Sequence, residues 1–271
     1  MTDPALAAAH SDPSDSALFA EERKALIVGL VTERGKVTVS ALRERFGVSG
    51  ATIRNDLREL QQQGLLARTH GGAIRNTKTG QEYSFAQREV QNLAAKQAIA
   101  TAASALIEDG DRIILDTGTT TMELARLLHR KRDLTVVTND LKIAWLLEEA
   151  EIPDIVLLGG AVRKGFHCTL PLPGESLLSR LSADKAFMGV NSFSPDRGAT
   201  TPDIRQAATK RAMIAAAEKT VLLCDQTKFG RVSFAQFATL GHVDALVTDG
   251  LPAGWAGMLE DTGIEIHVAG P

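Results

Sequence analysis

The chain has 271 residues, of which 44% are hydrophobic and 23% are charged, and its formal net charge is −3. This length exceeds one typical domain, and the hydrophobic content allows a sizeable core, so we expect two domains. No apolar run approaches the ~18 residues that cross a bilayer, so no membrane partner is expected. The two cysteines form neither a metal-ligand pattern nor a disulfide framework, which predicts no metal, no cofactor and a cytoplasmic location.

Charge is unevenly divided along the chain. Residues 1–18 are acidic, small and Pro-containing, which predicts a disordered tail and not a signal peptide. Residues 19–78 carry 11 Lys and Arg against 6 Asp and Glu, whereas residues 79–271 carry 19 against 24. Positive charge is therefore concentrated near the N-terminus, as contact with nucleic-acid phosphates requires. Because an excess of five is modest, tight binding is expected only of a dimer or a larger oligomer.

Residues 36–73 predict two short amphipathic helices, a tight turn between them at 47–49, and a basic hairpin. Ser49 is placed to cap the second helix. The outward-facing residues of that helix are Thr52, Arg54, Asn55 and Arg58. A capped helix with a polar, partly basic face suits the major groove of DNA. The alternative is an ordinary αα-hairpin, which does not explain why turn, cap, basic face and wing coincide.

Position on this helix and wing predicts the role of each side chain. Thr52, Arg54 and Asn55 are expected to approach base edges, because the N-terminal residues of a reading helix point into the groove. The residues expected mainly to hold phosphates are Ser49, Arg58, Arg68 and His70, of which the last two lie in the wing. Together, residues 19–74 are predicted to form a winged helix-turn-helix domain.

A second domain is predicted over residues 93–271, after a polar, Gly-containing linker at 75–92. Apolar runs predict strands at 112–115, 134–137, 155–158, 186–190, 221–224 and 245–247, and helices at 120–130, 141–149 and 205–217. Short apolar strands that alternate with helices indicate an α/β layer with a largely parallel sheet. Ligands of such sheets usually bind at the carboxyl ends of the strands.

The first chemical signal at a strand end is the segment 116–120, where Asp116 and Gly118 lead into a helix. Gly118 is expected to let the backbone turn sharply, and Thr119 and Thr120 to face an anion with their hydroxyls and amides. The segment lacks the Gly-Lys-Ser/Thr of a nucleotide P-loop. It predicts a phosphate-sized cradle, and a capped helix start without a ligand is the alternative.

Three further strand ends carry candidate ligand-binding residues. Asn139 either caps the next helix or contacts a ligand. Gly159 and Gly160 allow either a plain turn or close approach of a ligand to the backbone. Asp225 and Lys228 leave a buried strand together, so that Lys228 can meet a phosphate and Asp225 can hold Lys228 or bind a sugar hydroxyl. Such a pair is usually a solvated surface feature, but its place among the other strand ends favours a ligand site.

These motifs together resemble the DeoR family of bacterial transcriptional regulators over residues 19–249. The matching segments are 46–49, 52–54, 56–57, 64–66, 70–73, 116–120, 138–139, 159–160, 210–211 and 225–230. The resemblance implies an α/β fold class, with an N-terminal winged helix-turn-helix and a C-terminal sensor domain folded like ribose-5-phosphate isomerase. It also implies a pocket for a phosphorylated sugar that includes Lys210, operator affinity that responds to this effector, and repression as the usual mode.

The chain departs from the family pattern at two positions. Asn55 stands where the family commonly has Arg, and since Asn pairs with adenine whereas Arg favours guanine or phosphate, the operator preference is expected to differ. Gln206 stands four residues before Lys210, where the family often has an acidic residue, which puts one polar contact of the effector pocket in question.

An isomerase is the competing hypothesis. Such an enzyme needs a carboxylate that moves a proton between adjacent carbons, and none stands at 209–211, although Asp184 and Asp203 are near in sequence. The six histidines are scattered. A pure protein-interaction module explains neither the basic helix nor the cradle. The sequence therefore predicts a regulator, not an enzyme, that binds double-stranded operator DNA as a dimer or tetramer under the control of a phosphorylated sugar.

Overall fold

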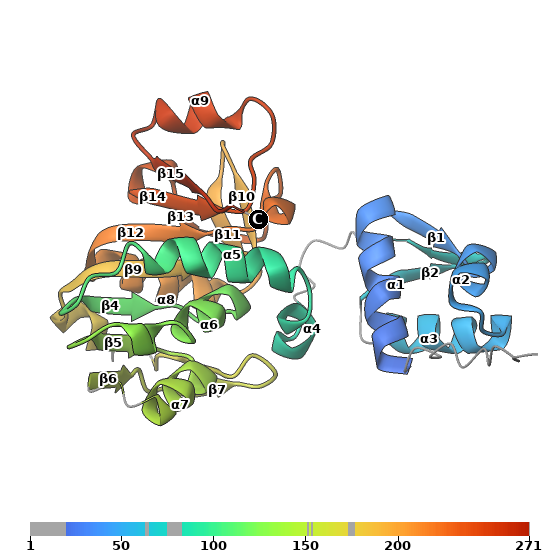
Figure 1. Cartoon of the computed structure of the whole chain (residues 1–271), viewed down its shortest axis with the longest axis horizontal. Helices are drawn as coiled ribbons and strands as arrows, with labels where there is room; N and C mark the ends of the chain where they lie inside the picture. Colours follow the sequence, from blue (N-terminus) through green and yellow to red (C-terminus); the bar gives the residue numbers. More distant parts are fainter. Residues whose placement is uncertain are drawn as a thin grey trace, which may run out of the picture. The chain divides into compact units, whose positions relative to one another are not determined.

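The computed structural model describes residues 20–62, 65–74, 83–150, 152, 154–172 and 177–270. The chain forms two compact units, Met1–Asn76 and Thr77–Pro271 (Figure 1). The expected disordered tail at 1–18 lies outside the described residues. None of the described helices combines the length and the apolar character needed to span a membrane.

The first unit is a winged helix-turn-helix, as expected. Its elements are α1 (Ala20–Arg34), β1 (Lys36–Thr38), α2 (Val39–Phe46), α3 (Gly50–Gln62), β2 (Ala67–Thr69) and β3 (Gly72–Ile74). The strands form an antiparallel sheet in the order β1-β3-β2. A side chain at Gly72 would place Cβ only 1.9 Å from the carbonyl oxygen of Val37, so the wing packs against β1 only with glycine there. The core is made of buried residues from all three helices, among them Ile27, Leu42 and Ile53.

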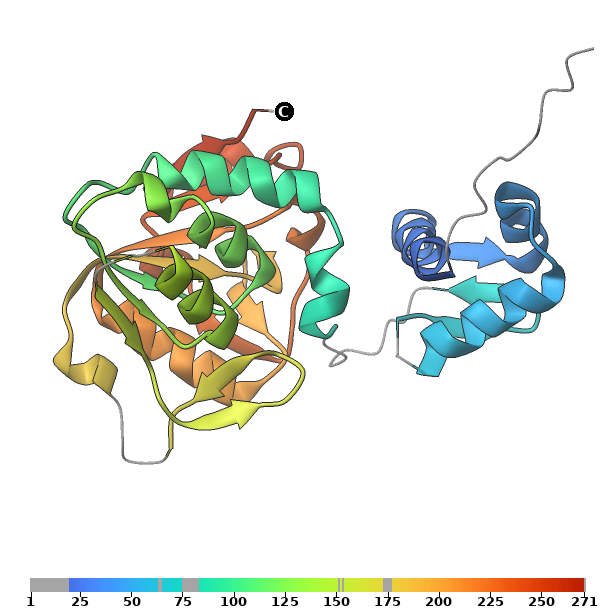
Figure 2. The ribbon, with the colours of Figure 1, turned by 60° about the horizontal axis from the view of Figure 1, so that its bottom comes forward.

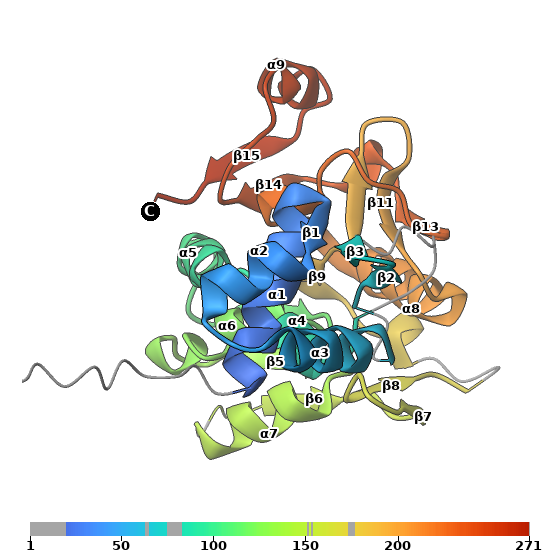
Figure 3. The ribbon, with the colours of Figure 1, turned by 90° about the vertical axis from the view of Figure 1, so that its right-hand side faces the viewer.

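The second unit is built on a seven-stranded sheet in the order β15-β14-β12-β9-β4-β5-β6, in which every neighbouring pair is parallel. The strands are β4 (Arg112–Leu115), β5 (Thr135–Thr138), β6 (Asp154–Leu157), β9 (Ala183–Gly189), β12 (Ala217–Leu223), β14 (Ala245–Thr248) and β15 (Glu265–Val268). Six of them correspond to the apolar runs expected from the sequence. Figure 3 shows β15 with α9 (Trp255–Glu260) at one end of the sheet and β6 with α7 (Leu141–Glu149) at the other.

Helices cover both faces of this sheet (Figure 2). One face carries α5 (Leu93–Ser104), α6 (Thr119–Ala125) and α7, and the other carries α8 (Ile204–Ala215) with a small sheet of β10 (Ser192–Ser194), β11 (Gly198–Thr201) and β13 (Ala235–Ala238). Successive residues of a strand point to opposite faces. Ile113 and Leu115 therefore join the core beneath α5 and α6, whereas Ile114 joins the core beneath α8. The remaining short elements are β7 (Ala161–Arg163), β8 (Cys168–Leu170), η1 (Leu128–Arg130), η2 (Leu177–Arg180), η3 (Gln226–Lys228) and η4 (Leu240–His242).

The described part of the expected linker, residues 83–92, folds onto the second unit. It contains α4 (Phe85–Glu89), and Phe85 is fully buried in the core beneath α5 and α6. The amide of Phe85 donates to the carbonyl of Gly165 in the β7–β8 hairpin at 3.1 Å, and the ammonium of Lys142 lies 4.3 Å from the centre of the Phe85 ring. The second unit thus includes ten residues that the sequence assigns to a linker, because one buried aromatic residue in a polar stretch produces no periodic pattern.

Candidate functional site

The turn between α2 and α3 has the geometry expected of a DNA-reading pair. Gly47 adopts a left-handed conformation, with φ 65°, and its amide donates to the carbonyl of Arg43 at 3.0 Å. The hydroxyl of Ser49 accepts a hydrogen bond from the amide of Thr52 at 3.1 Å, so Ser49 caps α3 as expected. The cap fixes where α3 begins, and hence which side chains occupy its first two turns.

The outward face of α3 is already organised by hydrogen bonds. Arg54, Asn55 and Arg58 are exposed. Asn55 donates from Nδ2 to Glu59 at 2.8 Å and accepts from Arg58 at 3.2 Å. Glu59 also accepts from Lys24 at 2.8 Å, and this ammonium lowers the pKa of Glu59 below its usual value. Glu59 therefore sets the direction of the Asn55 amide, a role that the sequence reasoning missed.

A buried ion pair supports α3 from behind. The guanidinium of Arg23 in α1 donates to both carboxylate oxygens of Asp56, at 2.7 and 3.1 Å. Both side chains are buried, and the hydrogen bond to Asp56 raises the pKa of Arg23. Such a bidentate ion pair fixes the orientation of the two side chains as well as their distance, so it holds α3 in a defined position on α1.

The wing presents its candidate residues to solvent. Arg68 lies in β2 and His70 in the turn before β3, and both are exposed. All seven residues expected at DNA thus belong to one unit and are exposed or half-buried: Ser49, Thr52, Arg54, Asn55, Arg58, Arg68 and His70. Their individual contacts with bases or phosphates stay predictions.

The carboxyl ends of the sensor strands meet at one edge of the sheet, as expected, but alternation divides their side chains between its two faces. Asp116 follows Ile114 by two positions and turns to the side of α8, where it contacts Lys210. Asp225 follows Leu223 and turns to the side of α5, where it accepts from Asn92 at 3.2 Å. The expected effector residues therefore form two groups.

Asp116 and Lys210 form a buried ion pair with each other. The ammonium of Lys210 donates to Asp116 and, at 2.8 Å, to the carbonyl of Gly189, whose own amide donates to Asp116 at 3.0 Å. Their side chains are only 1% and 2% exposed. Burial raises the pKa of Asp116, and the nearby ammonium opposes that shift. In this arrangement both charges are satisfied internally, so neither is left over for an effector.

The prediction of a sharp turn at Gly118 is wrong. Its φ of 167° and ψ of 162° describe extended backbone, which other residues also adopt. A Cβ there would lie 3.2 Å from the hydroxyl of Thr121, so any other residue requires a small shift of that side chain. No described side chain caps α6, so the capped-start alternative is not what the structure shows. Thr119 is buried and Thr120 half-buried at the start of this helix.

Asp225 and Lys228 are brought together at the end of β12. The ammonium of Lys228 lies 3.7 Å from a carboxylate oxygen of Asp225, and its side chain is 27% exposed. Asp225 also accepts from the amide and the hydroxyl of Thr227. Burial raises the pKa of Asp225, but Lys228 and Thr227 outweigh it and hold that pKa below its usual value. Asp225 therefore stays ionised and holds Lys228 in place, as one of the two expected roles requires.

Lys96 joins this group and was missed by the sequence reasoning. It is 4% exposed, and its ammonium donates to the carbonyls of Arg88 and Gln91. Burial and the positive charge of Lys228 lower the pKa of Lys96 to about 8. The signal was present in the sequence as a lysine on the apolar face of a helix, and the buried face of α5 consists of Lys96, Ile99, Ala100 and Ala103.

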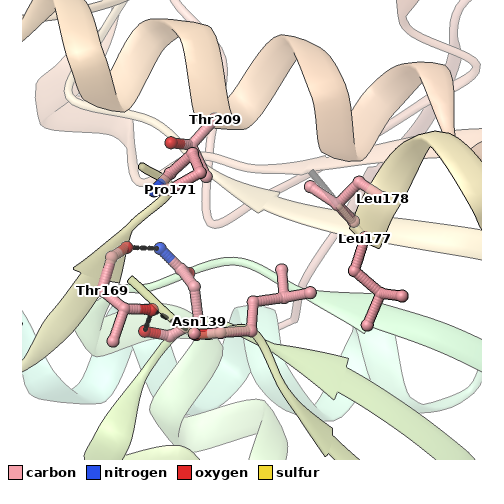
Figure 4. A pocket seen from close by; sticks show the side chains of 8 residues that line it. Asn139, Thr169, Pro171, Leu177, Leu178 and Thr209 are labelled. Carbon is pink, nitrogen blue, oxygen red and sulfur yellow. Dashed lines mark hydrogen bonds between the residues drawn. The ribbon is translucent and has the colours of Figure 1, made fainter. Parts of the chain in front are cut away.

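Asn139 does not cap α7, because Asp140 does so by accepting from the amides of Lys142 and Ile143 at 2.9 and 3.1 Å. Asn139 instead donates from Nδ2 to the carbonyl of Thr169 at 2.9 Å. It lines a small pocket between the sheet edge and α8 (Figure 4). The residues around this pocket are Asn139, Leu158, Gly159, Thr169, Pro171, Leu177, Leu178 and Thr209.

Gly160 belongs to the turn into the β7–β8 hairpin. Its φ is 138°, and a Cβ would lie 2.0 Å from the carbonyl oxygen of Leu170. This close approach of two backbone segments explains the glycine without a ligand, which favours the plain-turn interpretation.

Known families and relatives match both units. Residues 23–79 match the DeoR-like helix-turn-helix domain, and residues 91–250 match the DeoR C terminal sensor domain. The chain is 40% identical to the HTH-type transcriptional regulator GlpR of Haloferax volcanii, over 90% of this chain and 96% of that protein. It is 34% identical to the putative aga operon transcriptional repressor of Escherichia coli O157:H7 (92% and 94% covered) and 35% identical to the HTH-type transcriptional repressor GlcR of Bacillus subtilis (93% and 97%).

Among solved structures, ribose 5-phosphate isomerase A of Methanocaldococcus jannaschii is similar in part, with 19% identity and a TM-score of 0.39 over 51% of this chain and 55% of that chain. The relatives that match nearly the whole chain are named as regulators of transcription, which agrees with the expectation of a regulator and not an enzyme. On the match of both family domains, this chain belongs to the DeoR family of helix-turn-helix transcriptional regulators.

Proposed function

We propose that this protein represses genes of carbohydrate metabolism, and that a phosphorylated sugar bound at the carboxyl edge of the sensor sheet controls its grip on operator DNA. The names of two relatives as transcriptional repressors support the mode of action. One observation carries the effector assignment: two lysines from different elements, Lys96 and Lys228, both lie near the carboxylate of Asp225, with the ammonium of Lys228 3.7 Å from it.

A phosphate dianion complements this cluster. Lys228 is partly exposed and offers a point charge, whereas Lys96 is buried, and its pKa is lowered first by burial and then by the charge of Lys228. An anion beside Lys228 would offset the repulsion between the two ammonium groups and so raise the pKa of Lys96. Glu123 raises the pKa of Lys96, which shows that α6 lies near this cluster. Thr119 and Thr120 are the first two residues of the same helix.

Lys96 also provides a route from the effector to the start of the sensor unit. Its ammonium holds the carbonyls of Arg88 and Gln91, at the end of α4 and just beyond it. The chain enters the second unit through α4 from the DNA-binding unit. An effector that draws Lys96 toward a phosphate would loosen these two hydrogen bonds. Coupling follows only if the effector prefers one of the two arrangements of α4.

At the DNA, Thr52, Arg54 and Asn55 are proposed to approach base edges, and Ser49, Arg58, Arg68 and His70 to hold phosphates. The support is the exposure of these side chains around one capped helix and its wing. One such unit presents a small surface, so we propose a homo-oligomer on repeated half-sites, either a dimer or a tetramer.

Replacement of Lys228 tests the effector site. A thermal-shift screen can select the sugar phosphate, because a ligand at ~100 Kd adds about 2.7 kcal/mol of stability. Lys228→Ala should weaken the binding of that sugar phosphate, because it removes the positive charge that faces the phosphate. Lys219→Ala is the matched control, since Lys219 is exposed near the start of β12, whereas Lys228 lies in η3 beyond the end of that strand. Calorimetry should show weaker effector binding in Lys228→Ala alone, with operator affinity unchanged in the absence of effector. Equal effector affinity in both variants would rule the assignment out.

A further inference from the structure

The pocket beside Asn139 contains a buried acceptor without a donor. Asn139 is 1% exposed, and the hydrogen bond from its Nδ2 to the carbonyl of Thr169 fixes the orientation of the amide. A second hydrogen bond, from the amide of Thr169 to the carbonyl of Asn139 at 2.9 Å, holds the two backbones together. Among the described residues, nothing donates to Oδ1 of Asn139. A buried acceptor in this state carries an uncompensated desolvation penalty, which a donor from outside the chain would remove.

The other polar side chains of the pocket also have no donor to spare. The hydroxyl of Thr169 donates to the carbonyl of Leu158, and the hydroxyl of Thr209 donates to the carbonyl of Arg205 at 3.0 Å. A hydroxyl has one proton, so both can offer only acceptor lone pairs to a further group. The side chains of this pocket therefore select for donors (Figure 4).

The remaining walls exclude a charged group. Leu158, Leu177, Leu178 and Pro171 form the apolar part of the lining, and none of the described lining residues is charged. An ammonium group would donate well, but it would be desolvated here without a carboxylate partner. A neutral hydroxyl satisfies both conditions, because its O–H donates while the attached C–H groups pack on the leucines and the proline.

We infer that the Asn139 pocket is a subsite for a neutral, hydroxyl-bearing group whose O–H donates to Oδ1 of Asn139. The hydroxyl belongs either to the sugar part of the phosphorylated effector, in which case the inference rests on the proposed function, or to a separate neutral polyol. In both cases the pocket reads the hydroxyl pattern of the molecule and not its charge. It is distinct from the cluster of Lys96 and Lys228, which lies on the other face of the sheet edge.

Two substitutions test the subsite in the full-length protein. A Cβ at Gly159 meets nothing within 4 Å, and Gly159 is not in a left-handed conformation, so Gly159→Leu adds bulk at the pocket without a backbone clash. Thr209→Val keeps the shape of the side chain and removes its acceptor. Gly257→Leu is the control, because Gly257 is equally unobstructed but lies in α9. Thermal unfolding confirms that each variant is folded before binding is measured.

Calorimetry would use inorganic phosphate, two sugar phosphates (glucose 6-phosphate and fructose 6-phosphate), one polyol phosphate (glycerol 3-phosphate) and the three corresponding neutral compounds, glucose, fructose and glycerol. If the hydroxyl belongs to the effector, Gly159→Leu should lower the affinity for the sugar phosphate by about tenfold or more. Thr209→Val should lower that affinity by a smaller factor, and the affinity for inorganic phosphate should not change in either variant. If a separate polyol is bound, a neutral probe should show the same loss. The control should match the wild type throughout.

The inference is overturned if no probe distinguishes the wild type from Gly159→Leu, or if inorganic phosphate is weakened as much as the sugar phosphates. Failure of the proposed function would look different. Lys228→Ala would then leave the affinity for inorganic phosphate and sugar phosphates unchanged, whatever the result at Gly159.

Discussion

The buried pair of Asp116 and Lys210 makes a quantitative prediction about the sensor unit. Lys210→Met keeps the length of the side chain but leaves the carboxylate with the amide of Gly189 as its remaining cross-strand donor. Both side chains are at most 2% exposed, so water does not replace the lost ammonium. Breaking a buried pair from one side costs about 3–5 kcal/mol, and we expect a loss in that range. The double variant Lys210→Met, Asp116→Asn should recover at least about 2 kcal/mol, because the asparagine carbonyl still accepts from Gly189 without a charge.

Urea unfolding followed by tryptophan fluorescence measures these losses. The chain has two tryptophans, Trp145 and Trp255, and both lie in the second unit, so the signal reports on that unit alone. The stranded carboxylate of Lys210→Met has a pKa raised still further by burial, so it binds a proton more readily in the folded than in the unfolded state. The loss should therefore be smaller at pH 5 than at pH 8. A loss below about 1 kcal/mol for Lys210→Met, or a double variant equal to the sum of the single ones, would refute the pairing.

Three further predictions concern the effector, the DNA and the assembly. At pH 8 a phosphate dianion that binds beside Lys228 should raise the pKa of Lys96 from about 8, so calorimetry in buffers of different ionisation enthalpy should show proton uptake, and Lys96→Gln should abolish it. Asn55→Ala should relax discrimination at one base pair by ~1–3 kcal/mol. Arg68→Ala should lower the affinity for all DNA sequences nearly equally and reduce its dependence on salt concentration. If Arg68→Ala instead changed the sequence preference and Asn55→Ala did not, Arg68 would be the residue that contacts bases and Asn55 the one that contacts phosphates. Light scattering should report a dimer or tetramer for the whole chain and for a fragment that begins at Thr77, and a monomeric fragment would move the assembly surface to the N-terminal unit.

Strong local patterns predict most of the fold. The helix-turn-helix follows from its periodicity and its cap, and six of the seven sheet strands follow from buried apolar runs. β15 is missed because Glu265 and His267 interrupt its apolar residues, whereas β6, the opposite edge strand with the same exposure, keeps the apolar run 155–157. α1 is missed because its core segment, Ile27 to Val31, is apolar, rich in β-branched residues and interrupted by Gly29, a pattern that does not separate helix from strand.

The site is less predictable, because its pairings join distant segments. Lys210 and Asp116 are 94 positions apart, and Asn92 and Asp225 are 133 apart. Strand order and the alternation of side chains decide which of these residues meet, and neither can be read from a short motif. The sequence identifies the strand ends as the chemical edge of the sheet, but only the fold shows that Asp116 and Lys210 neutralise each other while Lys96 joins Lys228.

The most direct test of the central claim is the affinity for operator DNA, measured by fluorescence anisotropy with and without a saturating sugar phosphate from the thermal-shift screen. The proposal predicts that the effector changes the operator Kd of the wild type by about 5- to 150-fold, the usual range of allosteric coupling. It predicts no such change for Lys228→Ala at the same effector concentration, and a wild-type response in Lys219→Ala. An operator Kd that is unchanged by a sugar phosphate known to be bound would contradict the claim that this protein couples sugar sensing to DNA binding.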